Sequence, residues 1–236
     1  MYDLHVHTNL SIGEDPVQNV ADMAKRLGIK GIGIARYYSG TAIGELPGVE
    51  GIDLINCVII KPSNVNELAE LSRKARNKAE ILMVHGGNYE INRAACENSM
   101  IDVLCHPELG RRDSGLDHVC ARAAADNEVA LEINFREILE SYRRHRTYVL
   151  SSMMKNIKLA SKYGANIVTA SGAVSRWGLR SGRELASITN LLGLNLGDAI
   201  ATSSTIPEEM ITKNRNKLAN KEWLGVKIVD DRDDKA

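Results

Sequence analysis

Two histidines, His5 and His7, stand one residue apart near the start of the chain, in the sequence Asp-Leu-His-Val-His-Thr. Residues i and i+2 of an extended strand point to the same face, so both imidazoles can reach one ion. Neutral imidazole is a good ligand for zinc, manganese and iron. His106, in Leu-Cys-His-Pro-Glu, is a third candidate ligand. These three residues predict part of a metal site, and the remaining ligands must come from other segments.

Few other segments offer suitable ligands. Glu132 and His85 lie at or near the ends of two further predicted strands, but the strand that ends at Arg36 offers a cation, which would repel a metal ion. The strand that ends before Ser171 offers only a hydroxyl group. A catalytic metal needs several protein ligands and an open position for water. We therefore expect residual metal binding at most, and no tightly bound cofactor.

The composition is typical of a compact, soluble protein. The 236 residues are 44% hydrophobic and 25% charged, and their formal net charge is zero. No apolar run approaches the roughly 20 residues that cross a bilayer, and the first residues do not resemble a signal peptide. We expect a cytoplasmic protein with one domain at residues 1–229 and an acidic, disordered tail at 230–236. The four cysteines form no Cys-x-x-Cys pair, and we interpret them as reduced core thiols: Cys57, Cys96, Cys105 and Cys120.

Short apolar segments alternate with amphipathic ones along the chain. The predicted strands are residues 2–7, 31–36, 53–60, 80–85, 103–106, 129–134, 165–170 and 198–202. The predicted helices are residues 16–27, 65–78, 90–99, 117–127, 148–162, 181–192 and 207–219. This alternation predicts a single α/β domain, a (β/α) TIM-like barrel with parallel strands inside and helices outside. The carboxyl ends of the strands would then bring the histidines to one rim, where such barrels carry their function.

Two sets of motifs resemble known families. The run from Asp3 to Thr8 resembles the first motif of the polymerase and histidinol phosphatase superfamily of metal-dependent phosphoesterases, but the later metal-binding motifs of that superfamily are missing here. The segment Ala-Ser-Gly-Ala-Val-Ser-Arg-Trp, residues 170–177, is similar to a segment typical of the archaeal ribonuclease P protein component 3 family. That resemblance covers roughly residues 1–219 and extends to the strands at 31–35 and 131–134.

The resemblance implies a protein subunit of ribonuclease P, the ribonucleoprotein that removes 5′ leaders from precursor tRNA. Catalysis would belong to the RNA component with Mg²⁺, and this chain would help to fold that RNA. Its implied partners are the ribonuclease P RNA, precursor tRNA and other protein subunits, notably a small α/β component. No membrane partner is implied.

Basic residues gather in the second half of the chain. Residues 136–183 contain ten Lys or Arg and two acidic residues, a net charge of +8 on a neutral protein. Guanidinium groups suit phosphate oxygens, with which they form two parallel hydrogen bonds. We predict RNA contact by a set of arginines that includes one residue outside this segment: Arg36, Arg143, Arg144, Arg146, Arg176, Arg180 and Arg183. Trp177 is predicted to stack on a base or on a partner protein.

Two other functions fit parts of the sequence. A free-standing metal-dependent phosphoesterase would use His5, His7, His106 and Glu132, and would hydrolyse a phosphoester without any partner. A protein scaffold without RNA contact would show no salt-sensitive RNA footprint.

Overall fold

The computed structural model describes residues 1–40, 43–219, 222–223 and 226–227, so the predicted acidic tail at 230–236 lies outside the described residues. Seven parallel strands form one sheet in chain order: β1 (Tyr2–Val6), β2 (Gly31–Tyr38), β3 (Asp53–Ile60), β4 (Ile81–His85), β5 (Val103–Cys105), β6 (Ala130–Asn134) and β7 (Ile167–Ala170). The helices are α1 (Val17–Arg26), α2 (Val65–Ala75), α3 (Tyr89–Cys96), α4 (His118–Asp126), α5 (Phe135–Glu140), α6 (Arg144–Tyr163), α7 (Gly182–Leu191), α8 (Leu196–Ala201) and α9 (Thr205–Leu218). Shorter elements are η1 (Arg76–Lys78), η2 (Arg176–Gly178) and the antiparallel pair β8 (Glu222–Trp223) and β9 (Val226–Lys227).

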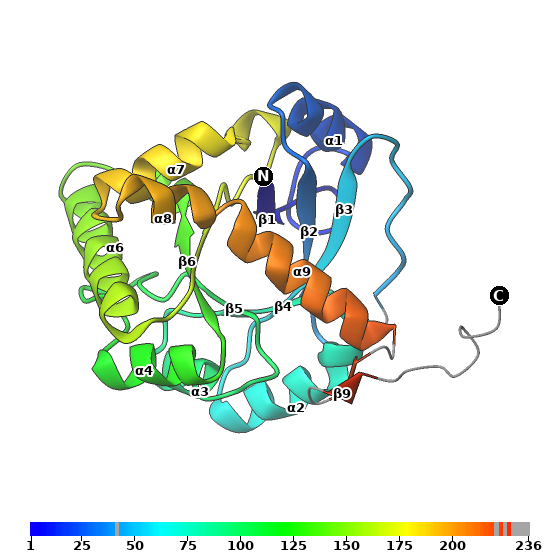
Figure 1. Ribbon diagram of the computed structural model, residues 1–236. Coiled ribbons are helices and arrows are strands. Elements are labelled where there is room, and N and C mark those ends of the chain that lie inside the picture. Colours follow the sequence, from blue (N-terminus) through cyan, green and yellow to red (C-terminus); the bar gives the residue numbers. More distant parts are fainter. Residues whose placement is uncertain (41–42, 220–221, 224–225, 228–236) are drawn as a thin grey trace.

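The sheet closes almost completely into a barrel, which confirms the predicted fold class (Figure 1). The gap between β7 and β1 is spanned at one end by a parallel bridge between Val6 and Ala173. At the other end the Tyr2 amide donates to the Ser203 carbonyl (2.7 Å). The seven strands therefore form a nearly closed barrel, with two short backbone contacts across the remaining gap.

The predicted eighth strand, at residues 198–202, is wrong, because this segment lies in and directly after helix α8. The Asn195 side chain caps the helix by accepting a hydrogen bond from the Asp198 amide (2.9 Å). Such an N-cap satisfies a backbone donor that the first turn leaves free. The mixed apolar pattern of this short segment resembles that of a strand, whereas its capping residue indicates a helix start.

Alternating residues of the strands pack on two sides of the sheet. Leu4, Ile55, Met83 and Val168 belong to a cluster that fills the barrel interior. A second set, which includes Ile32, packs against helices on the outside. Strands buried on both faces explain why the chain reads as short continuous apolar runs.

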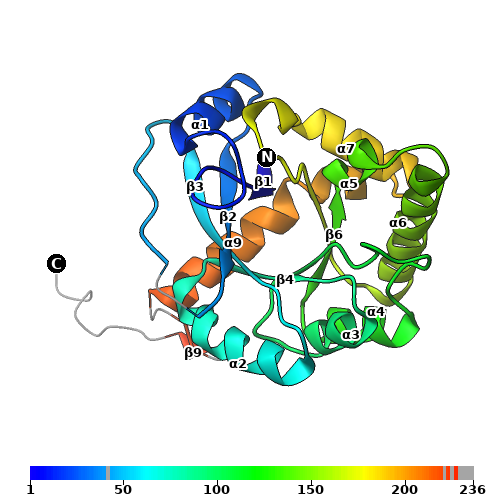
Figure 2. The ribbon, with the colours of Figure 1, turned by 180° about the vertical axis from the view of Figure 1, so that it is seen from behind.

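Helix α9 crosses the amino-terminal mouth of the barrel, as Figures 1 and 2 show from opposite sides. Arg215 donates two hydrogen bonds to the Asp53 carboxylate at the start of β3 (2.8 and 2.9 Å). Asn214 donates to Asp102 Oδ1, just before β5 (2.9 Å). With this mouth covered, the carboxyl ends of the strands are left as the face on which a site can form.

No helix among the described residues is long and apolar enough to cross a membrane.

Candidate functional site: a buried histidine cluster and an exposed arginine surface

Polar side chains from three strands meet inside the carboxyl mouth of the barrel. His5 and His7 come from β1 and the residue after it, Cys105 from the end of β5, and Glu132 from β6. His5, His7 and Glu132 are each only 1% exposed, and Cys105 is fully buried. The sequence prediction that the two histidines share one face is confirmed, because their Nε2 atoms lie 3.1 Å apart. We call this group, together with His106, the histidine cluster.

A chain of hydrogen bonds orders the imidazoles of the cluster. His7 Nδ1 donates to the Ala35 carbonyl oxygen (3.1 Å), since a carbonyl can only accept. Burial and the neighbouring His5 lower the pKa of His7 to about 3, so its ring is neutral and its Nε2 is an acceptor. His5 Nε2 must therefore donate to His7 Nε2, and in a neutral ring this leaves His5 Nδ1 without a proton. Yet His5 Nδ1 lies 2.6 Å from Glu132 Oε1, which is another acceptor.

A proton or a metal ion must therefore lie between His5 and Glu132. Although burial alone would raise it, ion pairing with His5 and His106 lowers the pKa of Glu132 to about 2, so this carboxylate is ionised. Two acceptors at 2.6 Å repel each other unless a proton or a metal ion lies between them. The second carboxylate oxygen, Oε2, is buried and has no hydrogen-bond partner among the described residues.

His106 lies beside this pair in an unusual backbone conformation. Its φ of 51° is in the left-handed region, which non-glycine residues seldom occupy. The ring centroid is 5.1 Å from that of His5, and Nδ1 is 3.2 Å from Glu137 Oε1 and 3.8 Å from Glu132 Oε2. Burial would lower the pKa of His106, but these two carboxylates raise it. The His106 ring is thus held between buried carboxylates that favour its protonated form.

Glu108, two residues further on, is an additional buried acid that the sequence did not single out. Both of its carboxylate oxygens are buried without a partner among the described residues. Desolvation raises the pKa of Glu108 to about 8, so the group is protonated at neutral pH.

The side chain that faces the cluster from β2 is Tyr37 rather than Arg36. Tyr37 stacks on His7 with ring centroids 5.8 Å apart and planes inclined by 9°. Arg36 points to the outside of the barrel and is 7% exposed. It donates to the Gly44 carbonyl (2.5 Å) and to Asn56 Oδ1 (2.8 Å). The expectation that Arg36 repels a metal is therefore wrong, and its predicted RNA contact would require these bonds to break.

The end of β7 also brings no ligand into the cluster. The Ser171 hydroxyl accepts from the Ala173 amide (3.1 Å), and the Ser171 amide donates to Asp3 Oδ1 (3.1 Å). Gly172 has a φ of 64°, and a Cβ there would lie 2.2 Å from Asn134 Oδ1. A multinuclear metal centre of the phosphoesterase kind does not fit these residues, because β2 contributes Tyr37 and the β7 end contributes only Ser171.

The predicted RNA-binding arginines at the start of α6 lie outside the barrel and are exposed. Helix α6 begins at Arg144, four residues earlier than predicted, so the basic run forms its first turn. Arg143, Arg144 and Arg146 are all exposed, as is His145 between them. That turn contains no acidic residue and has no side-chain cap, and Arg143 has a φ of 48°. We call Arg143, Arg144 and Arg146 the arginine turn.

A second set of predicted RNA-binding residues follows β7. Trp177 is 69% exposed, and the Arg176 guanidinium lies 4.9 Å from the centroid of its ring. Arg180 lies 5.1 Å from the Phe135 ring at the start of α5 and donates to the Trp177 carbonyl (3.0 Å). Arg183 is exposed on α7. The contact between Arg180 and Phe135 joins the segments that follow β6 and β7, as expected for neighbouring loops of a barrel.

Comparison with known proteins identifies relatives over nearly the whole chain. The family model for RNase P subunit p30 matches residues 1–219. Ribonuclease P protein component 3 of Methanosarcina acetivorans is 36% identical over 216 residues, which cover 91% of this chain and 90% of the relative. The protein of the same name from Methanococcoides burtonii is 35% identical over 215 residues, 91% and 88% of the two chains.

Solved structures extend the comparison to the fold. A chain in the cryo-EM structure of archaeal ribonuclease P with mature tRNA superposes with a TM-score of 0.78 at 25% identity, covering 98% of this chain and 99% of that one. Histidinol phosphate phosphatase from Lactococcus lactis shares the fold alone, with a TM-score of 0.54 at 12% identity over 82% and 94% of the chains. The sequence relatives and the family model agree with the barrel and its closing segment: this chain belongs to the RNase P subunit p30 family.

Proposed function

We propose that this chain is a protein subunit of ribonuclease P and assists the RNA-catalysed removal of 5′ leaders from precursor tRNA. Membership of the p30 family carries the proposal, since the family match spans residues 1–219. The relatives are ribonuclease P proteins, and this chain matches them over most of their length. A similar chain also occurs in the archaeal ribonuclease P structure with mature tRNA.

The arginine turn supports RNA as the ligand. The amino terminus of a helix carries a partial positive charge, so cations in the first turn destabilise α6 when nothing anionic is near. A phosphate would reverse this cost, because it pairs with the guanidinium groups and with the free amides of the helix end. Arg146 also donates to the Ser141 (2.9 Å) and Leu139 (3.3 Å) carbonyls at the end of α5. Phosphate binding therefore explains Arg143 and Arg144 better than the stability of α6 does.

The second arginine group adds a possible contact to bases. An exposed indole beside a guanidinium offers a flat surface on which an unpaired base can stack. In this proposal Arg176, Arg180 and Arg183 bind phosphates while Trp177 stacks on a base or on a partner protein. Arg36 is the least suited member of the predicted set, because it is buried and bonded within the chain.

The proposed assembly contains more than this chain. Its members are the ribonuclease P RNA, precursor tRNA and other protein subunits, among them a small α/β component, and it works in the cytoplasm. Mg²⁺ serves the RNA, where cleavage takes place. This chain positions RNA and partners, and its histidine cluster takes no part in the cleavage step.

Reconstitution tests this function directly. Cleavage of precursor tRNA should be measured with the ribonuclease P RNA and all protein subunits, and again with this chain omitted. Omission should slow cleavage or raise the Mg²⁺ concentration that cleavage requires. The same cleavage in both assemblies would refute the proposal, and hydrolysis of a phosphoester by the purified chain alone would favour a free-standing phosphoesterase.

A further inference from the structure

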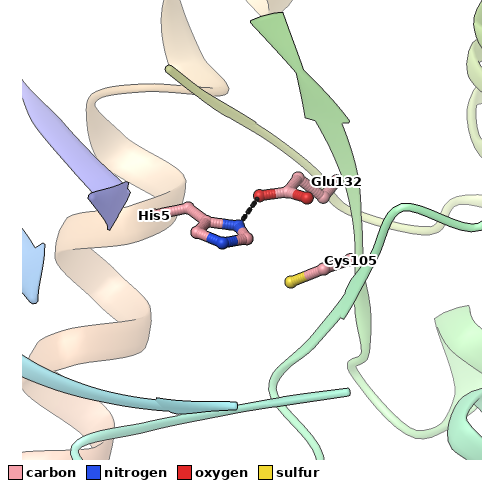
Figure 3. A group of neighbouring side chains, drawn as sticks. All are labelled: His5, Cys105 and Glu132. Atoms are coloured by element: carbon pink, nitrogen blue, oxygen red, sulfur yellow. Dashed lines mark hydrogen bonds and ion pairs between the residues drawn. The ribbon is translucent and has the colours of Figure 1, made fainter. Parts of the chain in front are cut away.

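Three potential metal ligands converge in the histidine cluster, from three different strands. His5, Cys105 and Glu132 each offer one ligand atom, and these atoms lie within 4.8 Å of one another (Figure 3). We propose that the chain binds one transition-metal ion of the zinc class here, through His5 Nδ1, Cys105 Sγ and a carboxylate oxygen of Glu132. This site is independent of the proposed function in RNA processing.

The spacing of the side chains leaves a place for an ion. His5 Nε2 already contacts His7 Nε2 (3.1 Å), which leaves His5 Nδ1 to face Glu132 Oε1 at 2.6 Å. A metal ion would receive both lone pairs. The remaining oxygen, Glu132 Oε2, is buried without a partner among the described residues, and so has no hydrogen bond to give up when the carboxylate turns toward an ion.

The dimensions suit a tetrahedral ion with small movements. Zinc bonds of about 2.0–2.3 Å place neighbouring ligand atoms roughly 3.3–3.8 Å apart. The three atoms lie between 2.6 Å, for the His5–Glu132 pair, and the 4.8 Å limit. His5 and Glu132 would therefore separate by less than about 1 Å, a shift within the range of side-chain rotation.

The chemistry of the ligands selects the class of ion. A thiol, an imidazole and a carboxylate favour zinc or cobalt over magnesium, which prefers oxygen ligands and keeps its water. Cys105 is a thiol in the free chain, since burial raises its pKa far above the usual range, and the ion would displace that proton to solvent. The site would stabilise the barrel mouth without hydrolysing a substrate.

The proposed ligand set differs from the sequence predictions in two ways. The sequence predicts Cys105 as a reduced core thiol, and it predicts no tightly bound metal. His5, His7, His106 and Glu132 are its candidate ligands, and the geometry keeps His5 and Glu132 but replaces His7 and His106 by Cys105. His7 instead orients the His5 ring through its second nitrogen, a supporting role that metal-binding histidines commonly require.

Metal content and a cobalt spectrum of the full chain test the proposal. The purified chain should be stripped with a chelator, loaded with Zn²⁺ or Co²⁺, dialysed, and analysed for metal. We expect one ion per chain, a rise in the melting temperature, and a thiolate-to-cobalt charge-transfer band in the near ultraviolet. A chain that retains no metal after dialysis, or a cobalt complex without that band, would overturn the proposal, and a proton then bridges His5 and Glu132.

Two cysteine variants assign the thiolate. Cys105→Ser should abolish the charge-transfer band and weaken binding at least tenfold, whereas Cys57→Ser should change neither, although Cys57 is equally buried in the barrel interior. The band surviving in Cys105→Ser would refute the assignment. If Cys105→Ser does not fold, X-ray absorption at the zinc edge of the unmodified chain can test the site instead. One sulfur ligand on the zinc is the expected result. A zinc ion without a sulfur ligand would refute the site.

Discussion

The histidine cluster and the arginine turn lie at the same end of the barrel but are built in opposite ways. In the cluster, the side chains of His5, Glu132 and His106 are almost fully buried, and the two imidazoles contact the carboxylate. In the turn, Arg143 and Arg144 are exposed at a helix start that contains no acid. Buried charges must be paired because an unpaired one is costly, whereas concentrated exposed charges of one sign attract an outside ligand. The cluster therefore suits a small ion or a purely structural role, and the turn suits the RNA of the proposed function.

The largest expected effect is the loss of a carboxylate from the cluster. Glu132→Ala leaves His5 and His106 without their buried counter-charge, which should lower the free energy of unfolding by about 3–5 kcal/mol. Urea denaturation followed by circular dichroism measures this. Glu140→Ala is the control, since Glu140 is an exposed acid whose loss should cost less than about 1 kcal/mol. Equal effects of the two variants would contradict the contrast between buried and exposed charges.

The buried Glu108 should make stability depend on pH. Between pH 5 and 8 the folded chain keeps the Glu108 proton, because its pKa is about 8, whereas the unfolded chain has lost it with an ordinary pKa of 4.5. Folding then takes up a proton, so this group's contribution to stability is full below pH 4.5 and falls by up to about 4 kcal/mol as the pH rises from 5 to 8. Glu108→Gln should remove that fall in urea titrations, while Glu90→Gln, on the exposed start of α3, should keep it.

The arginine turn should act mainly on RNA affinity, with a small loss of stability from the two carbonyl hydrogen bonds of Arg146. Removing Arg143, Arg144 and Arg146 together should weaken binding of the assembled proteins to ribonuclease P RNA at least tenfold. It should also reduce the slope of log affinity against log salt by about two to three. A triple variant of Arg73, Arg122 and Lys158, which are exposed on other helical surfaces, removes the same charge and should leave the slope near that of the unchanged chain. The same slope in both triples would show that position does not matter.

Trp177 should give the smallest effect. With its ring 69% exposed, Trp177→Ala should leave the melting temperature nearly unchanged. If a base stacks on it, RNA affinity of the assembly should fall by about 1–3 kcal/mol, and Trp177→Phe should restore most of the loss. Unchanged RNA affinity together with weaker protein–protein association would instead assign Trp177 to a partner subunit.

The sequence predicted the barrel and the shared face of His5 and His7, because both follow from local periodicity. Which residue faces inward at the end of β2 could not be predicted as safely. A shift of one residue along a strand turns a side chain to the other face, and Tyr37 rather than Arg36 points inward. The prediction of an eighth strand was wrong for a different reason. The apolar pattern of residues 198–202 is weak, and the capping residue Asn195 favours a helix there.

Cys105 was missed because adjacent residues of a regular strand point to opposite faces. The strand ends at Cys105, and His106 adopts a left-handed conformation with a φ of 51°. This turn lets both side chains reach the cluster, Cys105 beside Glu132 and His106 beside His5. A His-Pro pair after an apolar strand is the one signal in the sequence that could have suggested such a turn.

The central claim is that this chain serves ribonuclease P through the outer arginine turn. The most direct measurement is the rate of 5′-leader removal from precursor tRNA across Mg²⁺ concentrations, in assemblies that contain the unchanged chain, the triple variant of the arginine turn or the control triple. The variant of the turn should require more Mg²⁺ or cleave more slowly, and the control should match the unchanged chain. Identical Mg²⁺ dependence in all three assemblies would contradict the account.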